Sequence, residues 1–134
     1  MSKVISSNFL KSLRSAKRFK KLKDGWVKDA LLGVEWGPSS TEKMTWKDAI
    51  EYCKKQGGRL PEADELITLV DRSKHHPAIN AVAFPDTKTD DVYWTATELS
   101  GDPGYAWGVG FLYGLVLDGS KGFDYYVRPV RSSQ

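Results

Sequence analysis

The side chains that most often carry catalysis or bind metals are few in this chain. The two histidines, His75 and His76, are adjacent, so in extended chain they point apart and cannot readily share a metal ion. Cys53 falls on the apolar side of a predicted helix, which is more typical of a small buried residue than of a nucleophile. No Ser/His/Asp or Cys/His set has a suggestive arrangement, and no Gly-rich phosphate loop follows a predicted strand. We therefore expect no enzyme activity, catalytic residue, metal site or cofactor.

The chemistry that the sequence does favour is molecular recognition, and it lies in residues 105–131. Trp107, Val109 and Phe111 recur at every second position, which in a strand places them on one face. The positions between and beyond them would be polar on an ordinary solvated face, but they hold glycine, leucine and aromatic residues. A contiguous apolar patch usually marks an interaction surface. The alternative is that both faces of this strand are buried.

Thirteen positions around this strand are the candidate ligand-binding residues. They are Gly108, Gly110, Leu112, Tyr113, Leu115, Leu117, Asp118, Gly119, Ser120, Gly122, Phe123, Asp124 and Tyr125. The frame that fixes the backbone between them consists of Trp107, Val109, Phe111, Val116, Tyr126, Val127 and Val130. Exposed aromatic residues give a large contact area at low entropic cost, as they do in antibody paratopes. Arg128 and Arg131 are predicted to be structural, pairing with acids or capping carbonyls, with ligand contact as the alternative.

The size of the chain bounds what can support this surface. Its 134 residues suit one domain with a single core. Its apolar runs fall short of the roughly 20 residues that span a bilayer. The basic N-terminus lacks the apolar core and cleavage site of a signal peptide. The single cysteine cannot form an internal disulfide, which suits a reducing compartment or intracellular assembly.

The charge of the chain is unevenly distributed. Residues 1–23 hold eight Lys or Arg and no acid, which leaves −5 for the remainder of a chain whose net charge is +3. We assign residues 1–16 to a basic N-terminal arm and residues 17–134 to the ligand-binding domain. The arm could be a solvated linker, a polyanion site, or a helix that docks on a neighbour through apolar residues spaced four apart from Ile5 to Leu13. The mildly acidic remainder does not resemble a nucleic-acid surface.

The first element expected to position the recognition stretch is a helix that begins after Thr45. Thr45 is its N-cap, with Asp48 three residues on as a variant of the capping box. Apolar residues recur at helical spacing and form one side of this helix. Its members are Trp46, Ala49, Ile50 and Cys53. Gly57 or Gly58 then supplies the left-handed residue that ends the helix.

A second helix is predicted over residues 61–71. Pro61 suits the first helical position, and acidic residues follow near the positive end of the helix dipole. The buried stripe of this helix is predicted to contain Leu66, Leu69 and Val70. Residues 72–91 are rich in turn formers and predict a long surface connection.

Short apolar runs predict four strands after this connection, with glycines as hairpin and loop residues between them. These runs are 92–97, 105–111, 114–117 and 125–131. One or two further strands are expected between Phe19 and Trp36, around a turn at Asp24–Gly25. Two helices followed by antiparallel strands predict an α+β fold.

The order of these landmarks resembles a known family over about residues 17–131. The motifs are RFKKLKDGWVKD, LGVEW, MTWKDAIEYC, GGRLPEADELITLVD, FPDT, YWTAT, AWGVGF and YVRPVR. Together they resemble the C-terminal domain of the Legionella collagen-like adhesin. The resemblance implies a C-type-lectin-like fold, in which two helices pack on twisted antiparallel sheets, and a domain that binds ligands and is not an enzyme.

The resemblance also bears on the sites to expect. A distant relative, the formylglycine-generating enzyme, uses paired cysteines, whereas this chain has only Cys53. The calcium-dependent sugar site of true C-type lectins needs a Glu-Pro-Asn or Gln-Pro-Asp triplet and an Asn-Asp pair, and Asp102-Pro103-Gly104 is no substitute. Many relatives carry a cysteine near the C-terminus that can pair with the helix cysteine. Pro129 stands there instead, which removes that disulfide.

Proteins of the same fold include the variable proteins of diversity-generating retroelements. In those systems a reverse transcriptase randomises adenines, chiefly in asparagine codons, near the 3′ end of the gene. The altered codons can encode Gly, Leu, Tyr, Asp, Ser or Phe, but never Lys, Glu, Gln, Met or Trp. The thirteen candidate positions hold only residues of the first set.

These observations favour a receptor-recognition module of viral, phage or microbial origin that displays a variable surface on residues 108–125. The expected partner is a protein or glycan on a target surface rather than a nucleic acid, and self-association into a homo-oligomer stays open. Synthesis in the cytoplasm and display on a virion or cell surface fit this hypothesis. The alternative is an adhesin that binds a polyanion, a glycosaminoglycan or nucleic acid, through its basic N-terminal arm.

Overall fold

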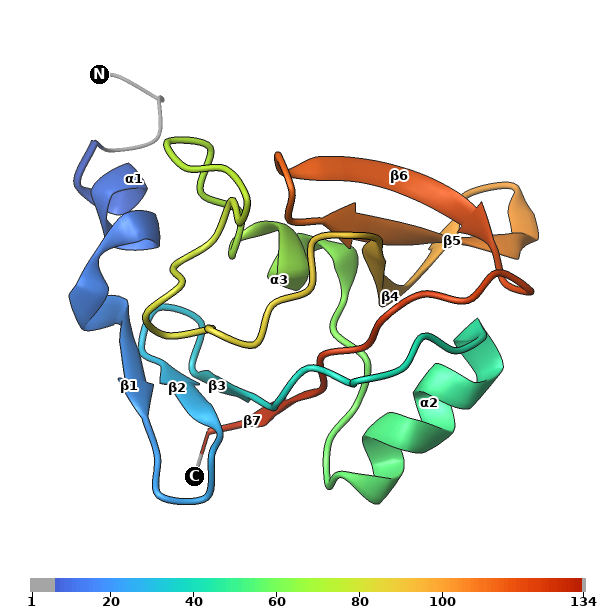
Figure 1. Cartoon of the computed structure of the whole chain (residues 1–134), viewed down its shortest axis with the longest axis horizontal. Coiled ribbons are helices and arrows are strands. Elements are labelled where there is room, and N and C mark those ends of the chain that lie inside the picture. Colours follow the sequence, from blue (N-terminus) through green and yellow to red (C-terminus); the bar gives the residue numbers. More distant parts are fainter. Residues whose placement is uncertain (1–6, 134) are drawn as a thin grey trace.

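A computed structural model describes residues 7–133 of the chain (Figure 1). Three α-helices lie in this part, and a short 3-10 turn follows the first of them. The helices are α1 (Ser7–Arg14), α2 (Trp46–Lys55) and α3 (Ala63–Ile67). The strands are β1 (Phe19–Lys21), β2 (Val27–Asp29), β3 (Val34–Trp36), β4 (Val92–Leu99), β5 (Asp102–Gly110), β6 (Leu115–Ser120) and β7 (Val130–Ser132). They form two antiparallel sheets, so the predicted α+β class is confirmed.

The first sheet joins the beginning and the end of the described chain. Its strand order is β1-β2-β3-β7. Gly25 makes the predicted turn after β1 with a φ of 91°, and Gly33 makes a second turn before β3 with a φ of 70°. Glycine adopts this left-handed backbone without the steric cost of a side chain. The second turn explains why residues 19–36 form three strands, where one or two were predicted.

The second sheet, of order β4-β5-β6, carries the recognition stretch. Strands β5 and β6 pair in unbroken register from Tyr105 opposite Ser120 to Gly110 opposite Leu115. Residues directly opposite one another in such a pair point to the same side of the sheet. The register therefore fixes which candidate side chains share a face.

One face of this sheet, the inner face, packs into the main core. It carries Tyr93, Val109 and Val116, which contact buried residues of the first sheet and of the α3 region. Val109 is fully buried, and Phe111, just past the end of β5, is 1% exposed. Trp107 is only half-buried on the same face. The alternating frame predicted at 107, 109 and 111 therefore points to the core, with its first member at the margin.

Helix α2 agrees with its prediction. The Thr45 hydroxyl accepts a hydrogen bond from the Asp48 amide at 3.3 Å, as expected of an N-cap. Gly57 follows the helix with a φ of 84°. Ala49 and Cys53 are fully buried in a second apolar cluster. Burial raises the pKa of the Cys53 thiol to about 12, so the group stays protonated and behaves as a small apolar side chain.

Helix α3 is shorter than the predicted 61–71. Its N-cap is Glu62, which forms a reciprocal capping box with Glu65. Pro61 therefore lies before the helix and not at its first position. The helix ends early because the chain leaves it in tight turns, in which the Asp71 amide donates to the carbonyl of Ala78 instead of continuing the helical ladder.

Residues 72–91 contain no helix or strand, as predicted, but they are not wholly on the surface. Ala78, Ile79 and Phe84 are at most 1% exposed and fill the main core. Val82 in the same segment is 81% exposed. Part of this connection is therefore a layer of the core rather than a surface loop.

Residues 125–131 were predicted as one strand, and this prediction is wrong. Only β7 at its end is a strand, whereas Tyr125 and Tyr126 make isolated bridges to Met44 and Tyr93. Pro129 has no amide to donate to a ladder, and the Val127 amide donates to a serine hydroxyl instead. The segment crosses from the second sheet to the first, as the red chain in Figure 1 shows.

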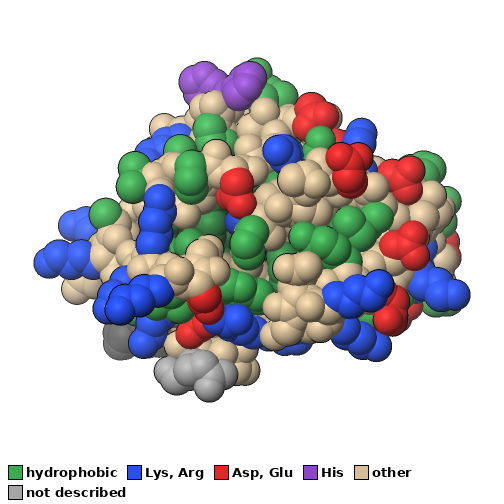
Figure 2. All heavy atoms as spheres, turned by 60° about the horizontal axis from the view of Figure 1, so that its bottom comes forward, with side chains coloured by type: hydrophobic (Ala, Val, Ile, Leu, Met, Phe, Trp, Pro, Cys, Tyr) green, Lys and Arg blue, Asp and Glu red, His purple; other side chains and the backbone are tan. Residues whose placement is uncertain are grey.

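The N-terminal part of the described chain is basic and partly apolar. Phe9 and Leu10 of α1 are exposed, and Ile5 lies outside the described residues. After α1, Arg18 is buried and forms two hydrogen bonds with the carboxylate of Asp29, at 2.8 and 2.9 Å. In Figure 2, Lys and Arg side chains lie on the left, where α1 and β1 lie, and also on the right, whereas most of the visible Asp and Glu side chains lie on the right.

Neither a membrane-spanning helix nor a metal-binding cluster is present in residues 7–133. None of the helices there is both long and apolar enough to cross a membrane. No group of three or more His, Cys, Asp or Glu side chains within that range could hold a metal ion.

Candidate functional site

The candidate residues surround the outer face of the second sheet, which is the side opposite to the inner face. The outer face carries Val92, Trp94, Ala106, Gly108, Gly110, Leu115, Leu117 and Gly119. One end of it is covered, because Trp94 and Ala106 pack with α2 and with residues 125–127. The other end, around Gly110 and Leu115, is open and is called the open end below.

Large apolar side chains are exposed along this face and its flanking turns. Tyr113 is 68% exposed, Leu115 is 60% exposed and Phe123 is 54% exposed. Leu112 and Leu117 are half-buried. A solvated sheet face normally carries polar residues at such positions. For β5 the alternative holds from Ala106 to Phe111, where both faces are buried apart from the half-buried Trp107. The exposed apolar side chains lie instead in the following turn, at the start of β6 and in the loop after β6.

The two outer-face glycines that belong to β5 are less accessible than the sequence suggested. Gly108 and Gly110 are both buried, because the side chain of Val92 lies across them. A Cβ atom at Gly108 would lie 3.1 Å from Val92 Cγ2, and one at Gly110 would lie 3.2 Å from Val92 Cγ1. A larger residue at either position requires Val92 to shift by a few tenths of an ångström. These two glycines are therefore buried beneath Val92 and offer little surface for a ligand to contact.

A closer contact couples two other candidates. The Tyr125 ring lies against Gly119, where a Cβ atom would approach the Tyr125 hydroxyl to 2.5 Å. The same ring packs on Trp94 at a centroid distance of 4.5 Å, and the Phe123 ring lies 6.2 Å from it. Burial raises the pKa of Tyr125, and the nearby carboxylate of Asp91 adds to this shift. Tyr125 is therefore half-buried: its ring packs against Trp94, and part of its side chain remains at the surface.

Not all thirteen candidates converge on one face. Asp118 and Ser120 pair with Trp107 and Tyr105, so they belong to the side of the sheet that carries Trp107. Gly122 and Asp124 are exposed in the loop after β6. The predicted set therefore divides into an outer-face group, a turn at 111–114, a loop at 122–125 and a pair on the opposite side.

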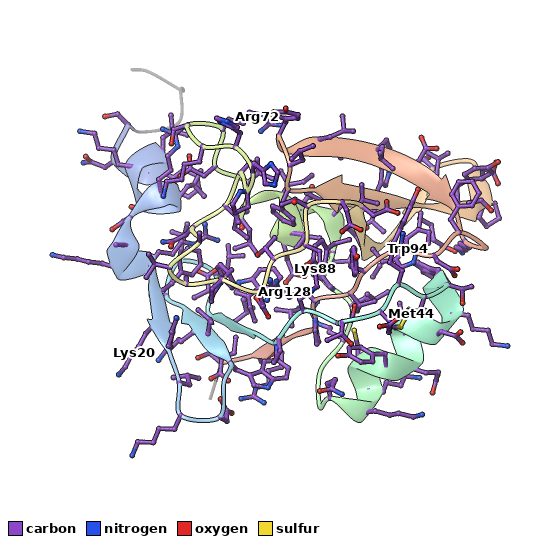
Figure 3. The ribbon with its side chains drawn as sticks, viewed as in Figure 1. Lys20, Met44, Arg72, Lys88, Trp94 and Arg128 are labelled. Carbon is purple, nitrogen blue, oxygen red and sulfur yellow. The ribbon has the colours of Figure 1, made fainter. Side chains whose placement is uncertain are left out.

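The turn at 111–114 is held by a segment that sequence reasoning did not connect with it. The His76 amide donates to the carbonyl of Leu112 at 2.8 Å. Arg72, labelled near the top of Figure 3, donates to the carbonyl of Gly114 at 2.9 Å. The His75 ring stacks on Tyr113 with centroids 6.1 Å apart. No local signal in the sequence joins the segment 72–78 to this turn.

A cavity of about 190 Å³ lies at the open end of the outer face. Gly110, Leu112 and Leu115 are among its apolar lining residues, and Asp90 and Asp91 are its acidic ones. We call it the Gly110 cavity. It joins candidate binding residues from β5, β6 and the intervening turn to the segment just before β4.

The carboxylates of this cavity have defined partners. The Tyr126 hydroxyl donates to Asp90 at 2.9 and 3.1 Å from its two oxygens. This hydrogen bond raises the pKa of Tyr126 to about 12, so the phenol remains a donor. Lys43 Nζ lies 3.3 Å from Asp91 Oδ2. Two carboxylates therefore face one ammonium group in this region.

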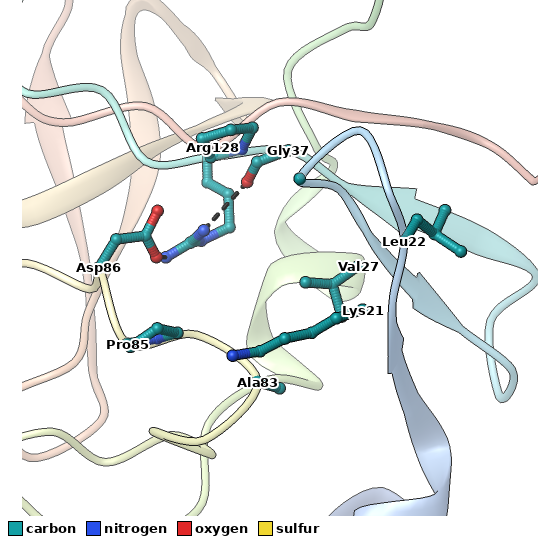
Figure 4. Close-up of a pocket in the computed structure, with 10 residues that line it drawn as sticks. Lys21, Leu22, Val27, Gly37, Ala83, Pro85, Asp86 and Arg128 are labelled. Carbon is teal, nitrogen blue, oxygen red and sulfur yellow. Dashed lines mark hydrogen bonds and ion pairs between the residues drawn. The ribbon is translucent and has the colours of Figure 1, made fainter.

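The two C-terminal arginines are structural, as predicted. Arg128 is 2% exposed and donates to the carbonyl of Gly37 at 3.0 Å and to Asp86 at 2.9 Å, beside a small cavity that Lys21 also lines (Figure 4). Burial acts to raise the pKa of Asp86, but the charge and hydrogen bond of Arg128 lower it overall. Arg131 pairs with two carboxylates, at 2.7 and 2.8 Å. Arg128 and Asp86 pair with each other, so Lys21 is the one remaining charge among the described residues that line the cavity.

A larger hollow of about 380 Å³ lies between β1 and the 72–91 segment. Arg14, Lys21 and Lys74 line it together with the exposed Val82. Arg14 also lies 3.6 Å from the carboxylate of Asp71. Three cationic side chains therefore line this hollow, and one of them already faces a carboxylate.

Comparison with known proteins gives one finding. The family model of the Lcl C-terminal domain, the C-terminal domain of the Legionella collagen-like protein, matches residues 25–131. The match covers both sheets except β1 and the last residue of β7, and it includes every candidate binding residue. No curated protein matches the chain.

Proposed function

The chain belongs to the Lcl C-terminal domain family, and from this premise we propose that it is an adhesin-like binding module that recognises a partner through residues 108–125. The observation that carries the proposal is the exposure of three large apolar side chains, Tyr113, Leu115 and Phe123, around the hairpin of β5 and β6, whose frame residues Val109 and Phe111 are buried. The partner is a protein or glycan on a target surface. The protein acts by binding and is not an enzyme.

The proposed fold is C-type-lectin-like, with residues 17–134 as the domain and residues 1–16 as a basic arm. Support comes from the family and from the arrangement of α2 and α3 around two short antiparallel sheets. The return of β7 to pair with β3 closes the domain. This arrangement leaves the hairpin of β5 and β6 free to carry a binding surface.

The energetic logic of the surface follows from its position. Exposed apolar groups contribute little to the free energy of folding. Each Å² of them that a partner covers contributes about 25 cal/mol to the free energy of binding. Rigid aromatic side chains such as Tyr113 and Phe123 lose few rotamers on binding. Their cost in stability is therefore low and their contribution to an interface is high.

We propose further that the gene is diversified by a retroelement at these positions. The thirteen candidates hold only residue types that adenine-altered codons can encode. The most exposed of them, Tyr113, Leu115 and Phe123, are the ones at which replacement disturbs the fold least. A near-copy of the 3′ end of the gene, with adenines at the candidate codons and a reverse-transcriptase gene beside it, is the expected genomic sign. A neighbourhood without that copy would contradict the diversification and leave the binding role intact.

The binding role is tested by replacing the three exposed side chains together with the half-buried Leu112. We expect arrays of glycans and cell-surface proteins to retain the wild-type protein on discrete spots. The combined change of Leu112, Tyr113, Leu115 and Phe123 to Ser should abolish that retention with little change in far-UV circular dichroism. The control is Val82→Ser, which removes an even more exposed apolar side chain from another part of the surface.

Two results would contradict the proposal. Retention of the combined variant on the same spots would show that another surface binds. Unfolding of the combined variant, with Val82→Ser still folded, would show that the four side chains belong to the core.

The second candidate function is polyanion binding by the basic side, favoured by the hollow that Arg14, Lys21 and Lys74 line. Lys21→Ala with Lys74→Ala should then lower the salt concentration that elutes the protein from heparin or DNA, because such contacts weaken steeply with ionic strength. Deleting residues 1–16 tests the contribution of the arm. Elution unchanged by both alterations would contradict this function.

A further inference from the structure

We infer that the Gly110 cavity receives a long cationic side chain, a lysine or arginine on the surface of a protein partner. This inference rests on the proposed function, because it specifies the chemistry of a partner of the same outer face. It depends on the shape of the cavity, on its apolar wall and on the acidic residues that line it.

The shape of the cavity fits one side chain. Its volume of about 190 Å³ lies below the roughly 300–1,000 Å³ of sites that hold whole small molecules. Its floor at Gly110 has no side chain, and a Cβ atom built there would meet Val92 at 3.2 Å. Gly110 adds no side chain to the cavity, which is bounded there by Val92 instead.

The wall of the cavity fits the aliphatic stem of such a side chain. Val92, Leu112 and Leu115 line it, with the Tyr113 side chain at its margin. Lysine and arginine bury their methylene groups against apolar surface while the charged head reaches a polar region. A short acidic or hydroxyl side chain would leave this wall uncovered.

The acidic lining of the cavity fits the charged head. Asp90 and Asp91 both line the cavity, and the only ion pair of either with a described Lys or Arg is that of Asp91 with Lys43. Lys43 is 39% exposed and its nitrogen lies 3.3 Å from the carboxylate, which leaves it free to move aside or to share the site. One ammonium does not neutralise two carboxylates. A second cation is therefore favoured and an anion is disfavoured.

Asp90 is held in position for this contact. Its two oxygens accept the same Tyr126 hydroxyl, and Tyr126 is itself buried and tied to β4 by a backbone bridge to Tyr93. A carboxylate oxygen accepts more than one hydrogen bond. Asp90 can therefore bind an incoming guanidinium or ammonium without releasing Tyr126.

The test uses side-chain probes on the whole protein. Nα-acetyl-L-arginine methylamide, the corresponding lysine compound and the neutral citrulline compound are titrated into the ¹⁵N-labelled chain and followed by NMR. We expect the two cationic probes to shift the amide signals of Val92, Gly110 and Leu115. The citrulline probe has nearly the same shape as arginine without the charge, so it should shift these signals only weakly.

Two matched variants complete the experiment. Asp90→Asn should weaken the binding of the cationic probes about tenfold, which is the effect of losing one charge-assisted hydrogen bond. Asp64→Asn removes the same charge from a position outside the cavity and should leave the binding constants unchanged. The amide spectrum of each variant reports directly that it is folded.

Several outcomes would overturn the inference. Equal binding of the arginine and citrulline probes would mean that the cavity is apolar only. Unshifted signals with every probe would mean that no side chain is received, and equal weakening by both variants would mean a diffuse charge effect.

The binding role of the outer face is judged separately. If the probes do not bind but the combined Ser variant still loses its array partner, the inference of a cation-binding cavity is wrong and the proposed binding face is retained. If the probes bind and the combined variant keeps its partner, the pocket stands and the proposed function is wrong.

Discussion

The division of the recognition stretch into frame and surface predicts different costs for the same substitution at two nearby sites. Phe111 and Phe123 lie in the same part of the chain and can both be changed to Ala. Phe111 is 1% exposed and contacts the Tyr93 ring at 5.6 Å, whereas Phe123 is 54% exposed. Residue type and deleted atoms are identical, so burial is the main variable.

The expected free energies follow from that burial. Phe→Ala in a closed core costs about 3–5 kcal/mol, because a cavity remains where the ring was. Phe123 buries a little under half of its side chain, and full burial contributes about 1.5–3 kcal/mol, so its replacement should cost about 1 kcal/mol. Its edge contact with the Tyr125 ring adds at most about 1 kcal/mol. The two variants should therefore differ by about 2–3 kcal/mol.

Urea unfolding followed by tryptophan fluorescence measures this difference. The midpoint should fall far more for Phe111→Ala than for Phe123→Ala, with similar slopes if both unfold in two states. The free energy of unfolding of a small domain is about 5–15 kcal/mol in total. The Phe111 variant should therefore be only marginally stable, whereas the Phe123 variant should remain folded. Equal losses in the two variants would refute the assignment of Phe123 to the surface and of Phe111 to the frame.

Three further predictions concern the scaffold. Thr45→Ala should cost about 1 kcal/mol of unfolding free energy through the lost N-cap, whereas Thr41→Ala, at an exposed position, should cost little; equal losses would contradict the cap. Gly119→Ala should destabilise the protein because its Cβ would meet Tyr125, and the same change in a Tyr125→Ala background should be nearly neutral in a double-mutant cycle. The Cys53 pKa is about 12 against an ordinary 9.0, so the unfolded chain loses this proton first and the unfolding free energy should fall as pH rises from about 9. Urea titrations between pH 8 and pH 10.5 should show a weaker fall in Cys53→Ala.

Local sequence signals predicted the elements whose formation depends on neighbouring residues. The cap at Thr45 and the stop at Gly57 each act within one helical turn, so both ends of α2 could be read from the chain. The alternation of Val109 and Phe111 required only the period of a strand. Helix α3 was predicted too long because its stripe of leucines continues into turns, where they are buried by tertiary packing rather than by a helix.

The arrangement of the binding surface depended on contacts that no short pattern contains. Val92 covers Gly108 and Gly110 from a neighbouring strand, and the segment 72–78 holds the turn at 111–114 through hydrogen bonds between parts of the chain that are distant in sequence. These partners are separated from the recognition stretch by the length of a strand or more. The prediction of an exposed apolar face could therefore succeed while the accessibility of its individual positions was wrong.

These contacts divide the candidate positions by what their replacement requires. Tyr113, Leu115 and Phe123 project into solvent, so a new side chain there changes the surface alone. Gly119 can accept a side chain only if Tyr125 becomes smaller or moves, since its Cβ would lie 2.5 Å from the Tyr125 hydroxyl. Stability should therefore penalise most combinations in which both of these positions are large. A surface diversified on this scaffold would vary independently at its exposed positions and in concert at this pair, so the number of foldable surfaces is smaller than the number of encoded ones.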